Sequence, residues 1–554
     1  MTKTILTSWQ RLIGLLKLDK KDIKQVFYYA IFAGLVNLSL PLGIQAIINL
    51  LQGAQISSSW IVLVILVTLG VAFAGLLQLM QMRIIENIQQ KIFTRSSFEF
   101  TYRFPKIKMS ELRNYYPPEL ANRFFDTLNV QKGLSKILID FPAALLQIIF
   151  GLVLLSFYHP FFIIYGMLLI VMIYIVFKFS AQRGLDTSLE ESKQKYKVAH
   201  WIQEIARSVL SFKLSGKTSL ALDKNDELVS NYLDARENHF KILIQQFIKL
   251  ISFKVLVTAG LLVIGGILVL NQEMNIGQFV AAEIIILLVI NSVEKLILGL
   301  ESFYDVLTSI EKLGQVVDKE LEPQDGANIS NTKSFSLELD NLSYIVPDMI
   351  KPIIENISFT INSKDRIMIY GSHGSGKTTL LKLIAGIIQP TSGVLYVNDI
   401  AMQGIKPNNY RGHVGQSLPE ESPFEGTIRD NLTFGDPNIS NNEIDDVLKH
   451  TKLIAFVKSQ PQGLNTILYP EGQRLSSTIA KKIVLARSIL KNPKLLILKD
   501  PLEQFDREEA ESIMNYLTDS NKTWALVVVS YNLEWMKKCS RVINIEQGKI
   551  IANN

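Results

Sequence analysis

Apolar residues are concentrated in the first 325 positions of this 554-residue chain, where they form runs long enough to cross a lipid bilayer. A membrane-spanning helix needs about 20 consecutive, mostly apolar residues. Six runs meet this requirement: residues 26–51, 60–82, 139–157, 161–180, 251–270 and 277–300. Beyond residue 325 the apolar stretches are short and are separated by Gly, Pro and Asn, which is typical of strands and turns.

The positive charges of the first half lie in the long segments between these runs. The short links QGAQISSS, FYHP and NQEMNIG contain no Lys or Arg, whereas segments 83–136 and 178–249 are rich in them. Because basic segments remain on the cytoplasmic side of a membrane, both long segments and both termini are predicted to be cytoplasmic. The predicted domains are an N-terminal cytoplasmic segment 1–24, a six-helix membrane domain 25–315, a linker 316–334 and a second domain 335–554.

Composition agrees with a membrane protein and excludes several other classes. Hydrophobic residues make up 48% of the chain and charged residues 19%, below the roughly 25% of an ordinary soluble protein. The net charge of +6 is spread over the whole chain, so no nucleic-acid partner is expected and membrane lipids are. Cys539 is the only cysteine, which excludes an internal disulfide and a cysteine-based zinc site.

Glu283 is an ionisable residue inside the sixth run. Its neighbours one helical turn away, Phe279, Val280, Ile286 and Leu287, are all apolar, so Glu283 has no partner on its own helix. Charges inside membrane spans are costly and often functional. Three roles stay open: Glu283 lines a substrate path, pairs with another helix of this or a second subunit, or lies at the outer interface.

The second half contains a phosphate-binding motif in the sequence RIMIYGSHGSGKTTLLKLIAGII, residues 366–388. An apolar strand, a glycine-rich loop and a helix follow in the order that this motif requires. Loop N–H groups and the helix N-terminus favour phosphate oxygens, Lys377 reaches the terminal phosphates and the Thr378 hydroxyl ligates Mg²⁺. The predicted ATP-binding residues are Gly371, Ser372, His373, Gly374, Ser375, Gly376, Lys377, Thr378 and Thr379.

Six spans, long cytoplasmic links and a C-terminal phosphate loop resemble a half-size ABC exporter over nearly the whole chain. The resemblance implies an all-α six-helix membrane domain joined to an α/β P-loop NTPase domain of the ABC type, acting as an ATPase coupled to transport. It implies that Tyr344, in LDNLSY, stacks on adenine, and that Gln416, in RGHVGQ, contacts Mg²⁺. Three further segments match the family pattern: PFEGTIRDNLTFG (423–435), LARSILKNPKLLIL (485–498) and INIEQGKI (543–550).

The chain departs from the family pattern where the family hydrolyses ATP. The signature LSGGQ stands as LSSTI at 475–479. The Walker B strand runs into Lys499 and Asp500 instead of Asp-Glu. A register shifted by one residue would make Asp500 the metal-side acid, but Asp506 fixes the register that places Lys499 there. Asp500 is then the candidate general base, one methylene shorter than Glu. Tyr531 replaces the switch histidine and cannot act as a near-neutral imidazole.

Together these features predict ATP binding with weakened hydrolysis. The predicted function is a half-subunit of a homo- or heterodimeric exporter that moves a peptide, protein or lipid-like substrate out of the cytoplasm. The alternative is a nucleotide-binding pseudo-ATPase that acts as a scaffold or regulatory membrane subunit. LPLGIQAIINLL and GQFVAAE resemble type I secretion and peptide exporters. That resemblance implies the inner membrane, a periplasmic adaptor and an outer-membrane channel.

Overall fold

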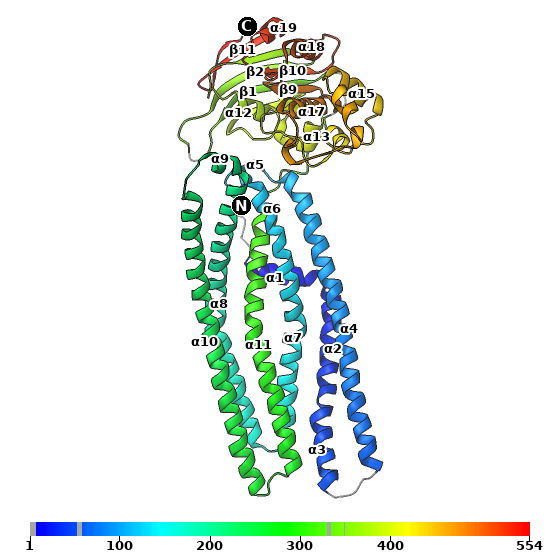
Figure 1. Cartoon of the computed structure of the whole chain (residues 1–554), viewed down its shortest axis with the longest axis vertical. Coiled ribbons are helices and arrows are strands. Elements are labelled where there is room, and N and C mark those ends of the chain that lie inside the picture. The colour runs from blue at the N-terminus through cyan, green and yellow to red at the C-terminus, as the bar shows by residue number, and fades with distance from the viewer. Residues whose placement is uncertain (1–6, 53–57, 330–333, 348, 554) are drawn as a thin grey trace. The chain divides into compact units, whose positions relative to one another are not determined.

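The chain forms two compact units in the computed structural model, which describes residues 7–52, 58–329, 334–347 and 349–553. The first, called the helical unit here, comprises residues 1–107 and 112–320. The second, called the sheet unit, comprises residues 108–111 and 321–554. Figure 1 shows long helices in the first and strands mixed with shorter helices in the second.

The helical unit is all-helical: its long helices run alongside one another, α1 lies across them, and short helices join them (Figure 1). They are α1 (Ser8–Leu18), α2 (Lys20–Asn37), α3 (Ser39–Gln52), α4 (Ser58–Arg103), η1 (Phe104–Lys106), α5 (Met109–Leu112, mostly assigned to the sheet unit), α6 (Pro117–Asn122), η2 (Arg123–Phe125), α7 (Asp126–Ser156), α8 (Phe161–Arg207), α9 (Val209–Leu214), α10 (Leu220–Leu270) and α11 (Ile276–Val317). The closest neighbours are α7 with α11, α8 with α10, and α2 with α4.

Five of these helical stretches are long and apolar enough to cross a membrane, counting the described residues only. They are Lys20–Leu51, Ser58–Lys106, Pro117–Ser156, Leu220–Leu270 and Ile276–Val317. The predicted span at 161–180 opens α8, whose apolar part Phe161–Tyr174 is shorter; the side chains of 175–177 and 179–181 lie outside the description. The long links are helical extensions, because α4 continues to Arg103 and α8 to Arg207.

Local sequence explains where the first helices begin and end. Thr7 and Gln10 form a capping box that starts α1. The first apolar run is split between α2 and α3 near Pro41, whose nitrogen cannot donate to the preceding turn. Arg11 of α1 pairs with Asp318, the C-cap residue of α11, at 2.5 Å. This pair ties the N-terminal helix to the last helix of the unit.

Glu283 is half-buried in α11 and forms no hydrogen bond or ion pair with any residue in the described ranges. The next acid along this helix, Glu294, pairs with Lys254 of α10 at 2.6 Å. Glu294 is therefore paired with a cation of a neighbouring helix, whereas Glu283 has no such partner among the described residues. The three roles considered for Glu283 remain predictions.

The sheet unit contains a six-stranded sheet, in the order β12-β11-β3-β10-β9-β6, and a four-stranded sheet, in the order β2-β1-β4-β5. The strands are β1 (Ser336–Tyr344), β2 (Ile354–Asn362), β3 (Arg366–Tyr370), β4 (Ser392–Val397), β5 (Ile400–Ala401), β6 (Val414–Ser417), β7 (Gly426–Thr427), β8 (Ile467–Leu468), β9 (Leu495–Lys499), β10 (Ala525–Val529), β11 (Arg541–Glu546) and β12 (Lys549–Asn553). The helices are α12 (Lys377–Ile384), α13 (Pro407–Gly412), α14 (Ile428–Thr433), α15 (Asn441–His450), α16 (Ile454–Ser459), α17 (Ser477–Leu490), α18 (Arg507–Thr518) and α19 (Glu534–Lys538).

The large sheet is buried on both faces, as continuous apolar strands require. Leu495 and Ile497 of β9 enter one hydrophobic cluster, and Leu496 and Leu498 enter the other. Strands β3, β6, β9, β10 and β11 pair in parallel. Their carboxyl ends therefore meet at one edge, where ligands bind in open α/β sheets.

Candidate functional site

The phosphate loop follows β3 and ends at the start of α12, as the sequence predicts. Gly374 and Gly376 have φ of +79° and +96°, a region that other residues adopt only with strain. A Cβ at Gly376 would lie 2.6 Å from the carbonyl oxygen of Ile353, and one at Gly371 would collide with the carbonyl of Ile545. The glycines are therefore required by the fold of the loop, whose backbone N–H groups, apart from those of Ser372 and Ser375, can face an anion.

Lys377 is buried within this loop. Its ammonium donates hydrogen bonds to the carbonyl oxygens of Gly371 at 2.9 Å and Ser372 at 2.6 Å, and to the hydroxyl of Ser375 at 3.3 Å. A positive charge is thus held inside the loop, beside the helix N-terminus that also favours phosphate. These parts fit the triphosphate of a nucleotide.

Glu546, at the end of β11, is a neighbour of the loop that the sequence analysis did not single out. Its carboxylate accepts hydrogen bonds from the backbone N–H of Ser372 at 2.9 Å and from the Ser372 hydroxyl. These hydrogen bonds lower the pKa of Glu546. Its place in INIEQGKI, the closing hairpin of the domain, was the one available signal.

Lys499 ends β9 beside the helix that follows the phosphate loop. Its ammonium donates a hydrogen bond of 2.8 Å to the hydroxyl oxygen of Thr378, the atom predicted to ligate Mg²⁺. Magnesium is normally held by carboxylates, substrate phosphates and water in an octahedral shell. A hydroxyl already bonded to an ammonium does not fit this donor set, so the residues here fit ATP better than they fit Mg²⁺.

Asp500, the predicted base, follows Lys499 at the same sheet edge. Its φ of +42° lies in the left-handed region, which Asp and Asn enter more readily than most residues. Its backbone N–H donates to the carbonyl of Val529 at 2.8 Å. Burial, together with the charge of Glu503, raises the pKa of the Asp500 carboxyl.

Tyr531, the residue at the switch position, packs against the phosphate loop. Its ring stacks on His373 with centroids 4.8 Å apart, and its hydroxyl lies 3.2 Å from His373 Nδ1. The Lys377 ammonium lies 5.1 Å from the Tyr531 ring centre. Tyr531 therefore contacts both His373 of the loop and the ring-facing charge of Lys377.

The remaining predicted residues lie in other elements or positions of the sheet unit. Gln416 is half-buried in β6, opposite Ile497 of β9. Tyr344 ends β1, where its carbonyl accepts a hydrogen bond from Ile353 and its ring packs against the core. Thr379 lies half-buried in α12. Their roles toward adenine, metal and phosphate stay predictions.

The altered signature segment starts α17. The Ser476 hydroxyl accepts a hydrogen bond from the Ile479 N–H at 3.2 Å and caps the helix. The Thr478 hydroxyl donates to the carbonyl of Gln504 at 3.2 Å. Of the two side chains that replace the family's glycines, Thr478 is therefore bonded to a neighbouring segment, while Ser477 is exposed.

Two models of one protein family match the chain. The model of the ABC transporter transmembrane region matches residues 26–293, and the ABC transporter model matches residues 354–503. Together they take in both units and most of the chain, including the phosphate loop and Lys499. The protein belongs to the ABC transporter family and is a multi-pass membrane protein with an ATP-binding domain.

Relatives with assigned activities align with part of the chain. The alpha-hemolysin translocation ATP-binding protein HlyB of Escherichia coli O157:H7 is 29% identical over 55% of this chain and 43% of its own length. The ATP-dependent lipid A-core flippase of Chromobacterium violaceum is 27% identical over 44% of this chain and 42% of its own length. The chain thus spans less than half the length of each of these two relatives.

The fold of the whole chain is that of a half-size ABC exporter. The structure of a bacterial Atm1-family ABC exporter with ATP bound superposes with a TM-score of 0.85, covering 97% of this chain and 95% of the other at 15% sequence identity. At this identity the likeness shows the fold alone. The sequence-based prediction of fold class, six-helix exporter domain plus ABC domain, is confirmed.

Proposed function

We propose that this chain is the ATP-binding half of a dimeric ABC exporter whose own nucleotide site binds ATP but hydrolyses it slowly or not at all. The observation that carries the proposal is the 2.8 Å hydrogen bond from Lys499 to the Thr378 hydroxyl. An ammonium stands where the family's metal-side acid is expected, and it contacts the hydroxyl that should face the metal. In this proposal Lys499 supplies the positive charge that Mg²⁺ supplies elsewhere.

The chain's own residues divide the work as follows. The loop N–H groups and Lys377 hold the phosphates, Tyr531 and His373 cover the loop, and Tyr344 receives the base. Asp500 is a poor base here because its left-handed backbone and short side chain fix the carboxylate at the strand end. Each missing transition-state group typically costs about a hundredfold or more in rate, although such losses are not additive.

The names of the two relatives support an export role for the dimer, with a protein or a lipid as cargo. We propose a location in the inner membrane with both termini in the cytoplasm, because basic residues gather in the long helical extensions. The partner is a second half-transporter, identical to this chain or different from it. A protein cargo would require a periplasmic adaptor and an outer-membrane channel.

A second candidate function is a scaffold or regulatory subunit whose bound ATP holds a dimer together without turnover. The same Lys499 contact favours it, since a site without a metal can bind a nucleotide and keep it. The two candidates predict different results when this chain is combined with a partner subunit that hydrolyses ATP. An exporter half raises transport by the pair, whereas a scaffold changes only its assembly.

The experiment that tests the proposal measures ATP affinity and ATPase rate of the purified protein in lipid, with Mg²⁺ and with EDTA. We expect ATP affinity to change less than about threefold between the two conditions, with a turnover close to the Lys377→Ala background. The variant Lys499→Ala should make binding depend on Mg²⁺ by about tenfold or more, because the charge must then come from the metal. Fast Mg²⁺-dependent turnover by the unmodified chain would overturn the proposal.

A further inference from the structure

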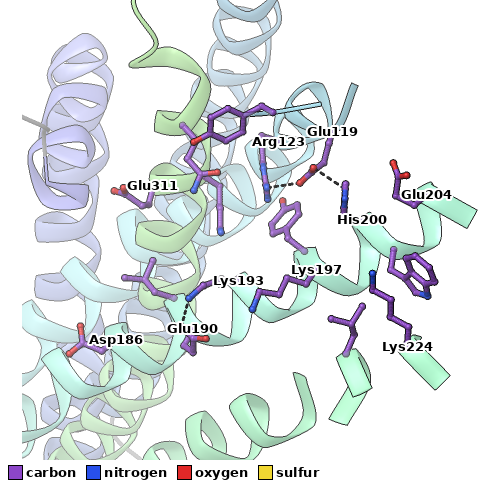
Figure 2. Close-up of a pocket in the computed structure, with 17 residues that line it drawn as sticks. Glu119, Arg123, Asp186, Glu190, Lys193, Lys197, His200, Glu204, Lys224 and Glu311 are labelled. Carbon is purple, nitrogen blue, oxygen red and sulfur yellow. Dashed lines mark hydrogen bonds and ion pairs between the residues drawn. The ribbon is translucent and has the colours of Figure 1, made fainter. Parts of the chain in front are cut away.

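The helical unit contains a second site, far along the sequence from the phosphate loop. A cavity of about 950 Å³ is lined by residues of α6, η2, α8, α10 and α11. Figure 2 shows Glu119, Arg123 and His200 on one side of it and Lys193 and Lys197 rising from α8. The volume is within the range of pockets that hold small molecules, about 300–1,000 Å³.

The cavity lies outside the apolar runs of the helices that form it. Its lining comes from residues 115–123, 186–204, 224–228 and 311–315, none of which falls in the six runs predicted to cross the membrane. The wall is therefore built from the polar extensions of the helices. Water and dissolved ligands can reach such a cavity without passing through lipid.

Two buried cations flank one aromatic ring in this wall. The guanidinium carbon of Arg123 lies 3.6 Å from the ring centre of Tyr196, and the ammonium of Lys312 lies 5.1 Å from it. Both residues are 7% exposed. Ring contacts of this kind attract a cation, but they are weak compared with the hydration that burial removes.

These cations are only partly paired. Arg123 Nη2 donates to Glu119 at 3.1 Å, while its Nε and Nη1 are buried and have no hydrogen-bond partner among the residues that the structure describes. Within the described part of the chain, Lys312 and Lys197 form no hydrogen bond or ion pair. Buried charges normally have partners, because an uncompensated one is costly.

The carboxylates of the wall, by contrast, are all engaged by neighbours. Glu119 accepts from Arg123 and lies 3.0 Å from His200 Nδ1. The others are Asp186 with Gln182, Glu190 with Gln194, Glu204 with Arg207, and Glu311 with Arg11. Behind the wall, buried Asp126 accepts the hydrogen bond of the Tyr196 hydroxyl. Asp126 also interacts electrostatically with Arg123 and Lys312. Apart from Asp186, whose partner is an amide, the acids of the wall have a basic partner. Among the described residues, the hydrogen-bonding groups of the wall that remain unused therefore belong mainly to Arg123, Lys312 and Lys197.

We propose that this cavity binds a small soluble anion carrying several phosphate or carboxylate groups. Such a ligand would pair with Lys312 and Lys197 and satisfy the nitrogen atoms of Arg123 after a small shift of that side chain. Charge-assisted hydrogen bonds are stronger than hydrogen bonds between neutral groups. These cations would therefore bind an anion more tightly than a neutral wall would. The site belongs to the helical unit alone and does not depend on the proposed nucleotide chemistry.

The test titrates pyrophosphate and citrate into the full chain carrying Lys377→Ala, in nanodiscs of zwitterionic lipid, by calorimetry. The background variant disables the phosphate loop, so a failure here is distinct from a failure of the nucleotide site. We expect Lys197→Gln to weaken binding about tenfold, the usual effect of one lost charge-assisted contact. Lys312→Gln should weaken it more. Lys241→Gln, which removes an exposed charge from α10 outside the cavity, should have no effect.

Two outcomes would overturn the proposal. One is absence of binding by both probes, and the other is an equal change with Lys197→Gln and Lys241→Gln. The Lys197 variant keeps the test decisive if the buried Lys312 variant fails to fold. Nanodiscs with phosphatidylglycerol distinguish the source of the anion, because a lipid headgroup bound here would compete with pyrophosphate. Competition that Lys197→Gln abolishes would overturn the assignment to a soluble ligand.

Discussion

The phosphate loop and the ends of β9 and β10 face the same site but differ in how closely they follow the requirements of ATP chemistry. In the loop, each glycine occupies a conformation or a space that excludes other residues, and Lys377 is held by three oxygen atoms. At the strand ends, an ammonium, a short acid in a left-handed conformation and a tyrosine stand together. In the proposed function, one site therefore keeps the parts needed for ATP binding and lacks those needed for hydrolysis.

The largest effect is expected when the phosphate loop loses its ability to bind ATP. Lys377→Ala should raise the dissociation constant of ATP about a hundredfold, because a charged hydrogen bond to phosphate contributes up to about 3 kcal/mol. Equilibrium binding of a labelled nucleotide measures it. Lys382→Ala on the same helix, which removes a surface ion pair with Glu420, is the control and should bind ATP normally. Equal losses in both variants would contradict the role of Lys377.

The next largest effect is expected when the family's residues are restored at the ends of β9 and β10. The triple variant Lys499→Asp, Asp500→Glu, Tyr531→His should raise Mg²⁺-dependent ATPase activity at least about tenfold over the unmodified chain. The gain is limited because the LSSTI segment is unchanged and because Glu adopts a positive φ less readily than Asp. Phosphate release in proteoliposomes measures it. No gain would mean that the defect lies in the signature segment.

A smaller effect is expected on stability, and it tests whether the signature segment stabilises α17. Ser476→Ala should lower the free energy of unfolding by about 1 kcal/mol, because it removes the cap of α17. Thermal unfolding of the purified protein reports the loss. Ser477→Ala, one residue further on and exposed, should leave the melting temperature unchanged.

The smallest effect concerns the acid at the strand end. Because the folded state raises the pKa of Asp500, its carboxylate opposes folding above that pKa, and this penalty disappears as pH falls below the unfolded value near 4. Asp500→Asn keeps a residue that tolerates the left-handed backbone and removes the charge. It should stabilise the chain at pH 7.5 by less than about 0.5 kcal/mol after solvent screening. Chemical unfolding at pH 7.5 and pH 4 should show the difference only at the higher pH.

Much of this architecture follows from local sequence patterns. Runs of about 20 apolar residues locate the membrane helices, and continuous apolar strands such as LLIL predict a sheet buried on both faces. The phosphate loop is equally predictable, since strand, glycines and helix are adjacent in sequence. Lys499 could be singled out because Asp506 fixes its register.

What escapes the sequence depends on contacts between distant residues. The bond from Lys499 to Thr378 joins residues 121 positions apart, and Glu546 meets Ser372 across 174. The cavity around Tyr196 combines residues from five helical elements, and no spacing along one helix predicts which cations lack a partner there. Such features require the packed structure.

The length of α10 has a mechanical consequence. Its 51 residues extend for about 76 Å at 1.5 Å per residue, whereas the hydrocarbon core of a bilayer is about 30 Å thick. More than half of the helix therefore stands in water as a stiff rod. If it tilts by about 10° where it leaves the lipid, an end about 45 Å away moves by roughly 8 Å. The helix works as a lever, in which a slight rotation at the membrane becomes a displacement longer than a helical turn.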